Sequence, residues 1–342
     1  MFMKHLVVFV GMIVFLIGIR DNIVFSASED EESDGVNVIL DTDLSSDVDD
    51  VGALATLFAL EAKGEVNTLA LGISVLNDWS PLAADAITTF YGRPEIPIGT
   101  AKSGINDGSR YAQEIAEEYS QSRGWDSVVD VPEVIEVYRE VLSQQPDNSV
   151  TFVTIGPMTN AAALLKSHPC QHSDLNGCNL VDKKVVRWVG MGGNHNEHNM
   201  SADAQASQIA LDSVNRWSTP VLFCPHGVGK AVQTGEGIKD LPDDHILHSA
   251  WSHYKGGTDN DWDHPSYDQC TVHYAVSGFD GSSAEDYYKI KGPGWYKIDS
   301  NVGYTGFDLD PEGLHRHIRQ DIDTFDEEHI AGEIEELMKY IP

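Results

Sequence analysis

An apolar run near the start of the chain ends abruptly at a cluster of acidic residues, and a helical pattern follows at once. The run Val36 to Leu40 is typical of a buried strand. From Val51 onward, apolar residues recur at the spacing of one helix face. We therefore predict a loop between the carboxyl end of a strand and the first turn of a helix, which is where ligands bind in open α/β sheets. The carboxylates in this loop belong to five aspartates: Asp41, Asp43, Asp47, Asp49 and Asp50.

Strand-like and helix-like patterns alternate along the rest of the chain, which predicts the α/β class. Apolar runs of strand length cover residues 66–74, 96–99, 150–155, 185–189 and 220–224, and residues 287–299 and 303–308 predict short strands. Helical patterns cover residues 81–91, 131–142, 202–211, 240–254 and 271–276, and a closing helix presents Ile330, Ile334, Leu337, Met338 and Ile341 on one face. Residues 100–130 are polar and Gly-rich, and we interpret them as a flexible flap. Length alone leaves open one large domain or two small ones.

The first 28 residues have the organisation of a secretory signal peptide. Lys4 and His5 form a slightly basic start, residues 6–19 are apolar, and residues 26–28 are small and precede an acidic run. The apolar stretch is short for the roughly 20 residues that span a membrane. We therefore predict cleavage near Glu29, a secreted or periplasmic protein, and no stable membrane association after cleavage.

The charge of the chain limits its partners. Its 342 residues include 22 Lys and Arg against 54 Asp and Glu, a formal net charge of −32. A polyanionic surface argues against nucleic acid and anionic membranes as partners. It is compatible with a neutral small molecule and with bound cations. The hydrophobic content of 41% is ample for a folded core, and the sequence leaves open whether the chain forms a homo-oligomer.

The four cysteines suit an oxidising compartment. Cys170 and Cys178 flank a polar segment, and we predict a disulfide that holds this surface excursion. Cys224 and Cys270 lie in apolar runs, and the cysteine spacing is not that of a zinc knuckle.

Three kinds of site fit an acidic loop at this position. A solvated helix cap explains aspartates near a first helical turn. A phosphatase of the haloacid-dehalogenase type also begins with a strand and Asp-x-Asp, here residues 41–43, but it does not need the other three aspartates. A calcium site explains the whole cluster, because hard divalent cations prefer oxygen ligands. An EF-hand does not fit, because the sixth and twelfth positions counted from Asp41 hold Ser46 and Gly52.

Several dispersed motifs resemble those of the calcium-dependent nucleoside hydrolases of the inosine–uridine-preferring type. The opening motif is Asp41-Thr42-Asp43 followed by Asp49-Asp50-Val51-Gly52-Ala53-Leu54, with a slightly longer loop that leaves Asp47 as a competitor for register. Each further motif follows a predicted strand or opens a helix: Asn77, Gly156-Pro157-Met158-Thr159-Asn160, Met191-Gly192-Gly193 with Glu197-His198-Asn199, and Asp268. Together the motifs span about residues 36–276.

The resemblance implies a nucleoside hydrolase fold as a single domain over residues 35–342, with an open, mostly parallel, Rossmann-like sheet flanked by helices. It implies Ca²⁺ held by Asp43, Asp50, the carbonyl of Ile155 and Asp268. It also implies that Asp43 is the general base on a metal-bound water. The implied substrate-binding residues are Asp49, Asn77, Met191, Glu197, Asn199 and either Asn194 or Asn196. The Asn- and His-rich run 194–199 also invites a transition-metal site, which the aspartate cluster makes the minor alternative.

One position departs from the family pattern. The familiar subgroup has a histidine directly before the helix-opening aspartate, as the acid for the leaving base, and here that residue is Tyr267. His264, Tyr267 and Trp262 are the candidates for contact with the leaving group, by protonation or by stacking. The preferred base and sugar therefore stay open.

Two functions from different classes fit these residues. The first is an exported, Ca²⁺-dependent N-ribohydrolase that cleaves a ribonucleoside to ribose and free base. The second is a secreted, Ca²⁺-dependent protein that binds a sugar or nucleoside without catalysis, because Tyr267 stands where an acid is familiar. A phosphatase is the third alternative. We favour the hydrolase because Asp43, the residue that activates water, is present.

Overall fold

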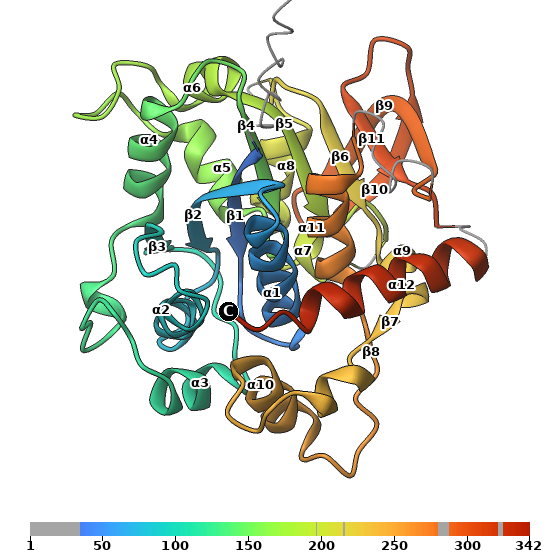
Figure 1. Cartoon of the computed structure of the whole chain (residues 1–342). Coiled ribbons are helices and arrows are strands. Elements are labelled where there is room, and N and C mark those ends of the chain that lie inside the picture. The colour runs from blue at the N-terminus through green and yellow to red at the C-terminus, as the bar shows by residue number, and fades with distance from the viewer. Residues whose placement is uncertain (1–34, 196, 215, 280–286, 321–323) are drawn as a thin grey trace, which may run out of the picture. The chain divides into compact units, whose positions relative to one another are not determined.

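β1 (Val36–Thr42) forms where the apolar run predicts it, inside a nine-stranded sheet (Figure 1). The computed structural model describes residues 35–342 except 196, 215, 280–286 and 321–323, so the predicted signal peptide, 1–28, lies outside the described residues. Val38 and Leu40 pack into one apolar cluster, whereas Ile39 packs into another. Because successive strand side chains point to opposite faces, β1 is buried on both sides.

The sheet is mostly parallel, as predicted. Its other strands are β2 (Val66–Ile73), β3 (Ile98–Thr100), β4 (Val150–Thr154), β5 (Val185–Met191), β6 (Val221–Cys224), β9 (Ile290–Asp299), β10 (Gly303–Leu309) and β11 (His315–Ile318). The strand order is β10-β9-β11-β6-β5-β4-β1-β2-β3. In this spatial order, all neighbouring strands from β11 through to β3 are parallel. β9 is antiparallel to both of its neighbours, β10 and β11. A separate small sheet pairs β7 (Gln233–Thr234) with β8 (His264–Pro265).

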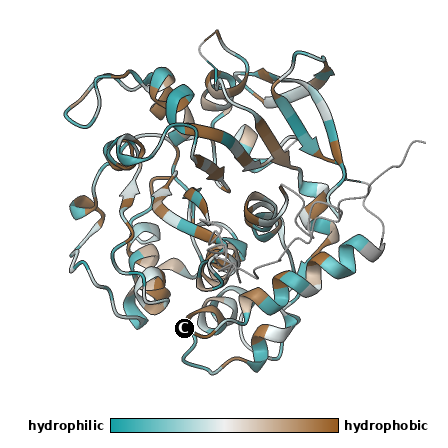
Figure 2. Ribbon diagram, turned by 45° about the horizontal axis from the view of Figure 1, so that its top comes forward, coloured by the Kyte–Doolittle hydropathy of each residue, from teal (hydrophilic) through white to brown (hydrophobic). Residues whose placement is uncertain are grey.

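Helices cover both faces of the sheet, and each face has its own apolar cluster. The helices are α1 (Asp49–Ala62), α2 (Ser80–Phe90), α3 (Ala112–Glu118), α4 (Val134–Gln144), α5 (Thr159–Lys166), α6 (Gly177–Lys184), α7 (His198–Ser201), α8 (Ala204–Leu211), α9 (His226–Ala231), α10 (Ile246–Lys255), α11 (Tyr267–Ser277) and α12 (Thr324–Met338). One cluster joins α1, α11 and α12, and the other joins α4, α5, α6 and α8. Hydrophobic residues concentrate on the central strands (Figure 2). Within the described ranges, no helix is both long enough and apolar enough to cross a membrane.

The strand order reverses between β1 and β4. From β1 the chain moves outward through β2 and β3, then returns to β4 on the other side of β1 and continues to β5 and β6. The amide of Ile155 donates to the carbonyl of Asp41 at 2.8 Å, so the carboxyl ends of β1 and β4 lie together. Ligands bind at such a switch point in open α/β sheets.

Several elements of the structure differ from the sequence-based predictions. Residues 100–130 contain α3 and a 3-10 turn, Val128–Asp130, because Tyr111 and Ile115 are fully buried and anchor the segment. The strand β11 escapes prediction, because three of its four residues are polar. Ile341 lies beyond the end of α12 and is 60% exposed, so it does not belong to the buried face of that helix.

The predicted disulfide is also wrong for this structure, because the sulfurs of Cys170 and Cys178 are not bonded to each other. Cys170 Sγ accepts a hydrogen bond from Arg139 Nε at 3.1 Å, and Cys178 Sγ donates to the carbonyl of Leu165 at 3.3 Å. The guanidinium of Arg139, which is 2% exposed, also donates to the carbonyls of Ser173 and Leu175. A buried arginine therefore organises the excursion that we expected a disulfide to hold.

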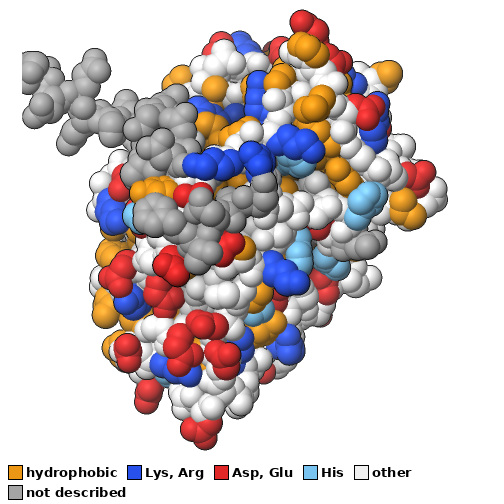
Figure 3. Space-filling model, turned by 90° about the vertical axis from the view of Figure 1, so that its right-hand side faces the viewer, with side chains coloured by type: hydrophobic (Ala, Val, Ile, Leu, Met, Phe, Trp, Pro, Cys, Tyr) orange, Lys and Arg blue, Asp and Glu red, His pale blue; other side chains and the backbone are white. Residues whose placement is uncertain are grey.

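The surface charge is unevenly distributed. On the face shown in Figure 3, acidic side chains gather in the lower part and basic side chains lie higher. The large negative net charge of the sequence is thus compatible with local basic regions on the described surface.

Candidate active site

Four aspartates from three separate places in the sequence meet at the switch point. Asp43 follows β1, Asp49 and Asp50 open α1, and Asp268 lies in the first turn of α11. Carboxylate oxygens of Asp49, Asp50 and Asp268 all lie within 4.8 Å of one another. None of the four residues is more than 5% exposed. The structure therefore concentrates negative charge in a place that is largely closed to water.

Hydrogen bonds hold the acidic loop in place. Leu44 adopts a left-handed conformation with φ of 47°, and its carbonyl accepts from Ser80 Oγ at 3.0 Å. The amide of Ser45 donates to Asp43 Oδ1 at 3.2 Å. The amide of Asp268 donates to Asp49 Oδ2 at 3.1 Å, which ties α11 to α1. The two helix starts are thereby fixed relative to each other.

Asp41 has a different position from the other predicted acidic residues. Its carboxylate accepts hydrogen bonds from the hydroxyl of Tyr138 and from Asn160 Nδ2 at 2.7 Å. The same amide of Asn160 donates to the carbonyl of Ile73 at 3.1 Å. The Asn160 side chain therefore joins β1, β2 and α5 behind the acidic loop. Burial raises the pKa of Asp41 to about 7, against the effect of these donors.

The acidic loop borders a cavity of about 310 Å³, which we call the acidic cavity. The predicted site residues that line it are Asp43, Asp49, Asp50, Ile155, Met191, Glu197, Asn199, Tyr267 and Asp268. The other lining residues are Asp47, the competitor for register, His198 from the Asn- and His-rich run, and Ser46 and His226, for which the sequence predicted no role in the site. Its volume is at the lower end of the range for small-molecule sites.

The carbonyl of Ile155 lies at the wall of the acidic cavity, directly after β4. It accepts a hydrogen bond from Asn199 Nδ2 at 2.8 Å, and a carbonyl oxygen has a second lone pair for another partner. Gly156 allows the turn after β4 to lie close to the turn after β1. A Cβ at Gly156 would lie 2.4 Å from Ser74 Oγ and 3.0 Å from the amide nitrogen of Asp43. The Gly-Pro turn therefore brings a backbone oxygen next to the aspartates.

Glu197 is a buried carboxylate on another wall of the cavity. Its Oε1 accepts from the amide of His226 at 2.7 Å, and its Oε2 accepts from the amide of Asn194 at 2.8 Å. Burial raises its pKa to about 7, while the two amide donors act in the opposite direction. Two backbone donors thus fix the orientation of the carboxylate toward the cavity.

Four described candidates for contact with the substrate do not line the acidic cavity: Asn77, Asn194, Trp262 and His264. Asn77 caps α2, because its Oδ1 accepts from the amides of Trp79 and Ser80, and it borders a neighbouring cavity of about 670 Å³. The side chain of Asn194 donates to Gln320 Oε1 at 3.1 Å. His264 lies with its Nε2 3.6 Å from Asp47 Oδ2, and Trp262 is completely buried. Asn196 lies outside the described residues.

Burial distinguishes Asp49 and Asp50 from Asp47 in the acidic loop. Asp49 and Asp50 are 1% exposed in the first turn of α1, beside Asp268. The side chain of Asp47 is 34% exposed and faces His264. Asp49 and Asp50 are therefore more buried than Asp47, which also lines the acidic cavity.

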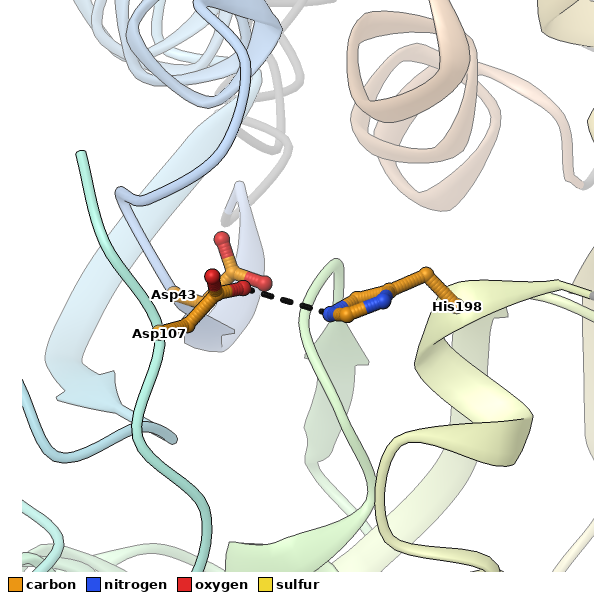
Figure 4. Close-up of side chains that lie close together, drawn as sticks. All are labelled: Asp43, Asp107 and His198. Atoms are coloured by element: carbon orange, nitrogen blue, oxygen red, sulfur yellow. Dashed lines mark ion pairs between the residues drawn. The ribbon is translucent and has the colours of Figure 1, made fainter. Parts of the chain in front are cut away.

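An ion pair that the sequence did not predict lies beside Asp43. His198 Nε2 lies 3.2 Å from Asp107 Oδ2, and Figure 4 shows the two side chains meeting in front of Asp43. Asp107 Oδ2 also accepts from Ser45 Oγ at 3.1 Å. No sequence signal marks Asp107, which lies in the segment without a firm pattern. His198 lies between Glu197 and Asn199 of the Glu-x-Asn motif, and this position in the sequence could have marked it as a site residue.

His226, which follows β6, is a second lining residue that the sequence did not predict. Its imidazole stacks on the ring of Tyr267, with centroids 4.8 Å apart and an interplanar angle of 23°. Nothing in the sequence pairs these residues, because they are 41 positions apart and only the packing of α9 on α11 joins them.

Burial raises the pKa of the carboxyl groups in the acidic cavity. The pKa of Asp43 is raised to about 6 by burial and by the nearby carboxylates of Asp47 and Asp107, although Ser45 donates to it. Burial, followed by the negative charge of the neighbouring aspartates, raises the pKa of Asp49, Asp50 and Asp268 well above the ordinary value. Either protons or a cation must offset this repulsion.

The donor set fits a hard divalent cation. Oδ1 of Asp49 is buried and has no hydrogen-bond partner among the residues that the structure describes. The surrounding donors are carboxylate and carbonyl oxygens, which are the ligands that Ca²⁺ prefers. The acidic cavity therefore has the composition of a metal site, although its residues do not identify the ion.

The fold and this cavity together define an α/β enzyme whose carboxylates are arranged for a cation and a small substrate. The chain belongs to the inosine-uridine preferring nucleoside hydrolase family, because a model of that family matches residues 38–326. The resemblance drawn from the motifs is thereby confirmed. The protein is a hydrolase that acts on N-glycosyl compounds, in a metal-dependent family. Membership argues against the phosphatase alternative.

Known relatives share both sequence and fold with this chain. The non-specific ribonucleoside hydrolase RihC of Escherichia coli O1:K1 is 26% identical over 245 residues, which covers 65% of this chain and 73% of that protein. RihC of Salmonella schwarzengrund is 28% identical over 249 residues with the same coverage. The purine-preferring ribonucleoside hydrolase from Gardnerella vaginalis superposes with a TM-score of 0.64 at 17% identity, covering 89% of this chain and 99% of that one. The inosine-uridine preferring nucleoside hydrolase from Bacillus anthracis gives 0.61 at 15% identity, with the same coverage.

Proposed function

We propose that the protein is an exported, Ca²⁺-dependent N-ribohydrolase that cleaves a ribonucleoside to ribose and free base. The observation that carries the proposal is the acidic cavity, where predicted metal and sugar ligands converge from loops far apart in sequence. Asp43, Asp50, the carbonyl of Ile155 and Asp268 line it together with Glu197 and Asn199. Family membership supports the reaction class.

In this proposal Asp43, Asp50, the Ile155 carbonyl and Asp268 hold the Ca²⁺. The ion, when bound, orients the sugar hydroxyls and makes water a better nucleophile at neutral pH. Asp43 accepts the proton of the attacking water. The water oxygen bonds to C1′ while the bond to the base breaks through an oxocarbenium-like transition state.

The remaining polar residues of the cavity position the sugar. Glu197 has its two oxygens fixed by backbone amides, so its carboxylate is ready to accept hydrogen bonds from ribose hydroxyls. Asn199 is held between the Ile155 carbonyl and Met191 Sδ. Asp49 has one buried oxygen without a protein partner, which suits a substrate hydroxyl or a bound water.

The direct test is release of reducing sugar from a panel of ribonucleosides, with and without a calcium chelator. We expect Asp43→Asn to lower kcat by at least about 100-fold, in the range of a lost general base. Asp174→Asn is the matched control, because Asp174 is exposed and does not line the acidic cavity. Unchanged activity in Asp43→Asn would contradict the proposal.

A binding protein without catalysis is the second candidate, because a tyrosine precedes Asp268 where an acid is familiar. Calorimetry that detects nucleoside or ribose binding, combined with no release of sugar, would favour this candidate over the hydrolase.

Export rests on the pattern of residues 1–28 and is a separate part of the proposal. We expect amino-terminal sequencing of the protein from the medium or periplasm to begin near Glu29. A mature chain that retains Met1 inside the cell would contradict export and leave the enzymatic proposal in place.

A further inference from the structure

Cleavage of an N-glycosidic bond leaves an electron pair on the base, and a base that departs without a proton is a poor leaving group. A residue that supplies this proton is needed only if the proposed N-ribohydrolase function is correct, and the inference below rests on that function. Besides the carboxyl groups, the side chains lining the acidic cavity that carry an exchangeable proton are those of Ser46, His198, Asn199, His226 and Tyr267. A serine hydroxyl and an amide are too weakly acidic for this purpose.

Tyr267 is poorly suited as the donor. Its ring stacks on the imidazole of His226, with centroids 4.8 Å apart and an interplanar angle of 23°. A phenol is also a much weaker acid than an imidazolium, because their ordinary pKa values are about 10 and about 6.5. The Tyr267 ring is therefore better suited to pack than to ionise.

His198 is engaged elsewhere. Its Nε2 lies 3.2 Å from Asp107 Oδ2, and ligand atoms of both residues lie within 4.8 Å of the Asp43 carboxylate. This position is on the side of the cavity where the proposed base accepts a proton from water. A proton donor to the departing base is needed next to the other reacting bond.

His226 has a fixed backbone, and its ring is held by stacking. Its amide donates to Glu197 Oε1, which couples the residue to the proposed sugar ligand, and its ring stacks on Tyr267. No hydrogen bond or ion pair to the ring is present among the described residues. The side chain is exposed, so solvent can return a proton to the imidazole after each turnover.

The packing of α9 against α11 maintains this stack. A Cβ at Gly229 would lie 2.3 Å from Tyr267 Cα, so glycine allows the two helices to approach closely. The carbonyl of Gly229 accepts a hydrogen bond from the amide of Ser266 at 2.9 Å. These contacts bring the imidazole and phenol together although neither residue signals the other in the sequence.

We propose that His226 is the general acid that protonates the departing base, and that Tyr267 holds its imidazole by stacking. As the C1′–N bond breaks, its electron pair stays on the base nitrogen and takes the proton from the His226 imidazolium. The attacking water forms the C1′–O bond and gives one proton to Asp43. Return of a proton to His226 from solvent and release of one from Asp43 restore the enzyme.

The test compares two substrates that differ in their need for an acid. Inosine has a base that needs protonation, whereas 4-nitrophenyl β-D-ribofuranoside has a leaving group that departs as a stable anion. We expect His226→Gln to lower the ratio of kcat/KM for inosine to that for the nitrophenyl riboside by about 100-fold or more. Turnover of the nitrophenyl substrate also shows that the variant is folded.

Three further variants make the test selective. His168→Gln is the control, because His168 is exposed and does not line the cavity, and it should leave the ratio unchanged. A selective loss in His198→Gln or Tyr267→Phe would assign the donor to that residue and overturn the proposal. An unchanged ratio in His226→Gln, or equal loss on both substrates, would also overturn it. If the wild-type protein cleaves neither substrate, the proposed function itself fails.

Discussion

Buried carboxylates dominate the chemistry of this protein at the residue scale. Asp43, Asp49, Asp50 and Asp268 are nearly inaccessible to water and lie close to one another. Desolvation and mutual repulsion both disfavour their charged forms. The free energy needed to hold these groups ionised must therefore come from a cation, and removal of the cation should destabilise the folded state.

The stability of the calcium-free protein should decrease as the pH rises. The pKa of Asp43 is raised from its ordinary value to about 6 in the folded state, so its contribution is fully present below pH 3.8 and lost as the pH rises through 6. Asp49, Asp50 and Asp268 are shifted in the same direction. We expect calcium to raise Tm more at pH 7.5 than at pH 5, because it competes with these protons.

Asp50→Asn separates the effects of repulsion and metal binding. It removes one negative charge from the cluster, so the calcium-free variant should melt about 2 °C or more above the wild type at pH 7.5. The same variant should lose most of the Tm increase on adding calcium. Differential scanning calorimetry with chelator and with calcium measures both quantities. A wild-type-like calcium shift in this variant would contradict the assigned ligand role.

His315 gives an independent pH dependence far from the aspartates in sequence. It is completely buried, and its Nδ1 accepts a hydrogen bond from the amide of Tyr296 at 3.0 Å, so the folded state holds the neutral ring. Burial, and then the charge of Arg216, lowers its pKa to about 3. The unfolded state binds a proton below about pH 6.5, so stability is present above that pH and lost as the pH falls.

This linkage is measurable by chemical denaturation. Between pH 6.5 and 5, His315 should reduce the free energy of unfolding by about 2 kcal/mol. We expect His315→Gln to lose about that much less than the wild type over this interval, whereas exposed His168→Gln should follow the wild type. An equal pH dependence in all three proteins would contradict the neutral, buried state of His315.

At the scale of elements, the site depends on how closely the turns after β1 and β4 approach. Gly156 lies at the contact, where even a methyl group meets Ser74 Oγ and the backbone of Asp43. Gly332 in α12 has nothing within 4 Å of the position where a Cβ would lie. The two glycines therefore offer a matched pair for substitution by alanine.

Gly156→Ala should destabilise the protein by about 1–3 kcal/mol, as overpacking does, and weaken calcium binding because Asp43 must move. Gly332→Ala should stabilise it by about 0.5–1 kcal/mol, because glycine is costly inside a helix. Urea denaturation and calcium titration test both expectations. If Gly156→Ala binds calcium as tightly as the wild type, the close approach is not needed for the site.

Elements with a strong local pattern could be predicted from the sequence, and elements defined by distant contacts could not. β1, β4 and α1 have continuous or periodic apolar residues, and the aspartates mark the loop between β1 and α1. β11 could not be predicted, because it is mostly polar. Its two histidines stack on aromatic rings that lie far away in sequence and meet them only in the folded sheet. The His226–Tyr267 stack and the position of Asp107 could not be predicted for the same reason, because they depend on neighbours far away in sequence.

At the scale of the whole molecule, the parallel sheet places the proposed calcium and sugar ligands together at the carboxyl ends of its strands. Asp43, Ile155 and Glu197 follow different strands, and Asp268 reaches the same place from α11. The dispersed motifs could be predicted to converge because carboxyl ends of parallel strands meet. Asn77 shows the limit of that argument, because its side chain follows a strand but caps α2 and borders the neighbouring cavity.

The central claim is that carboxylates and one backbone carbonyl from these separate loops bind one calcium ion. A crystal structure of the mature protein with calcium and ribose tests it most directly. We predict a single ion at the switch point, with Asp43, Asp50, the carbonyl of Ile155 and Asp268 as ligands at about 2.3–2.6 Å, and the ribose hydroxyls on the same ion. An ion bound elsewhere, or ordered ribose with no ion between these residues, would contradict the account.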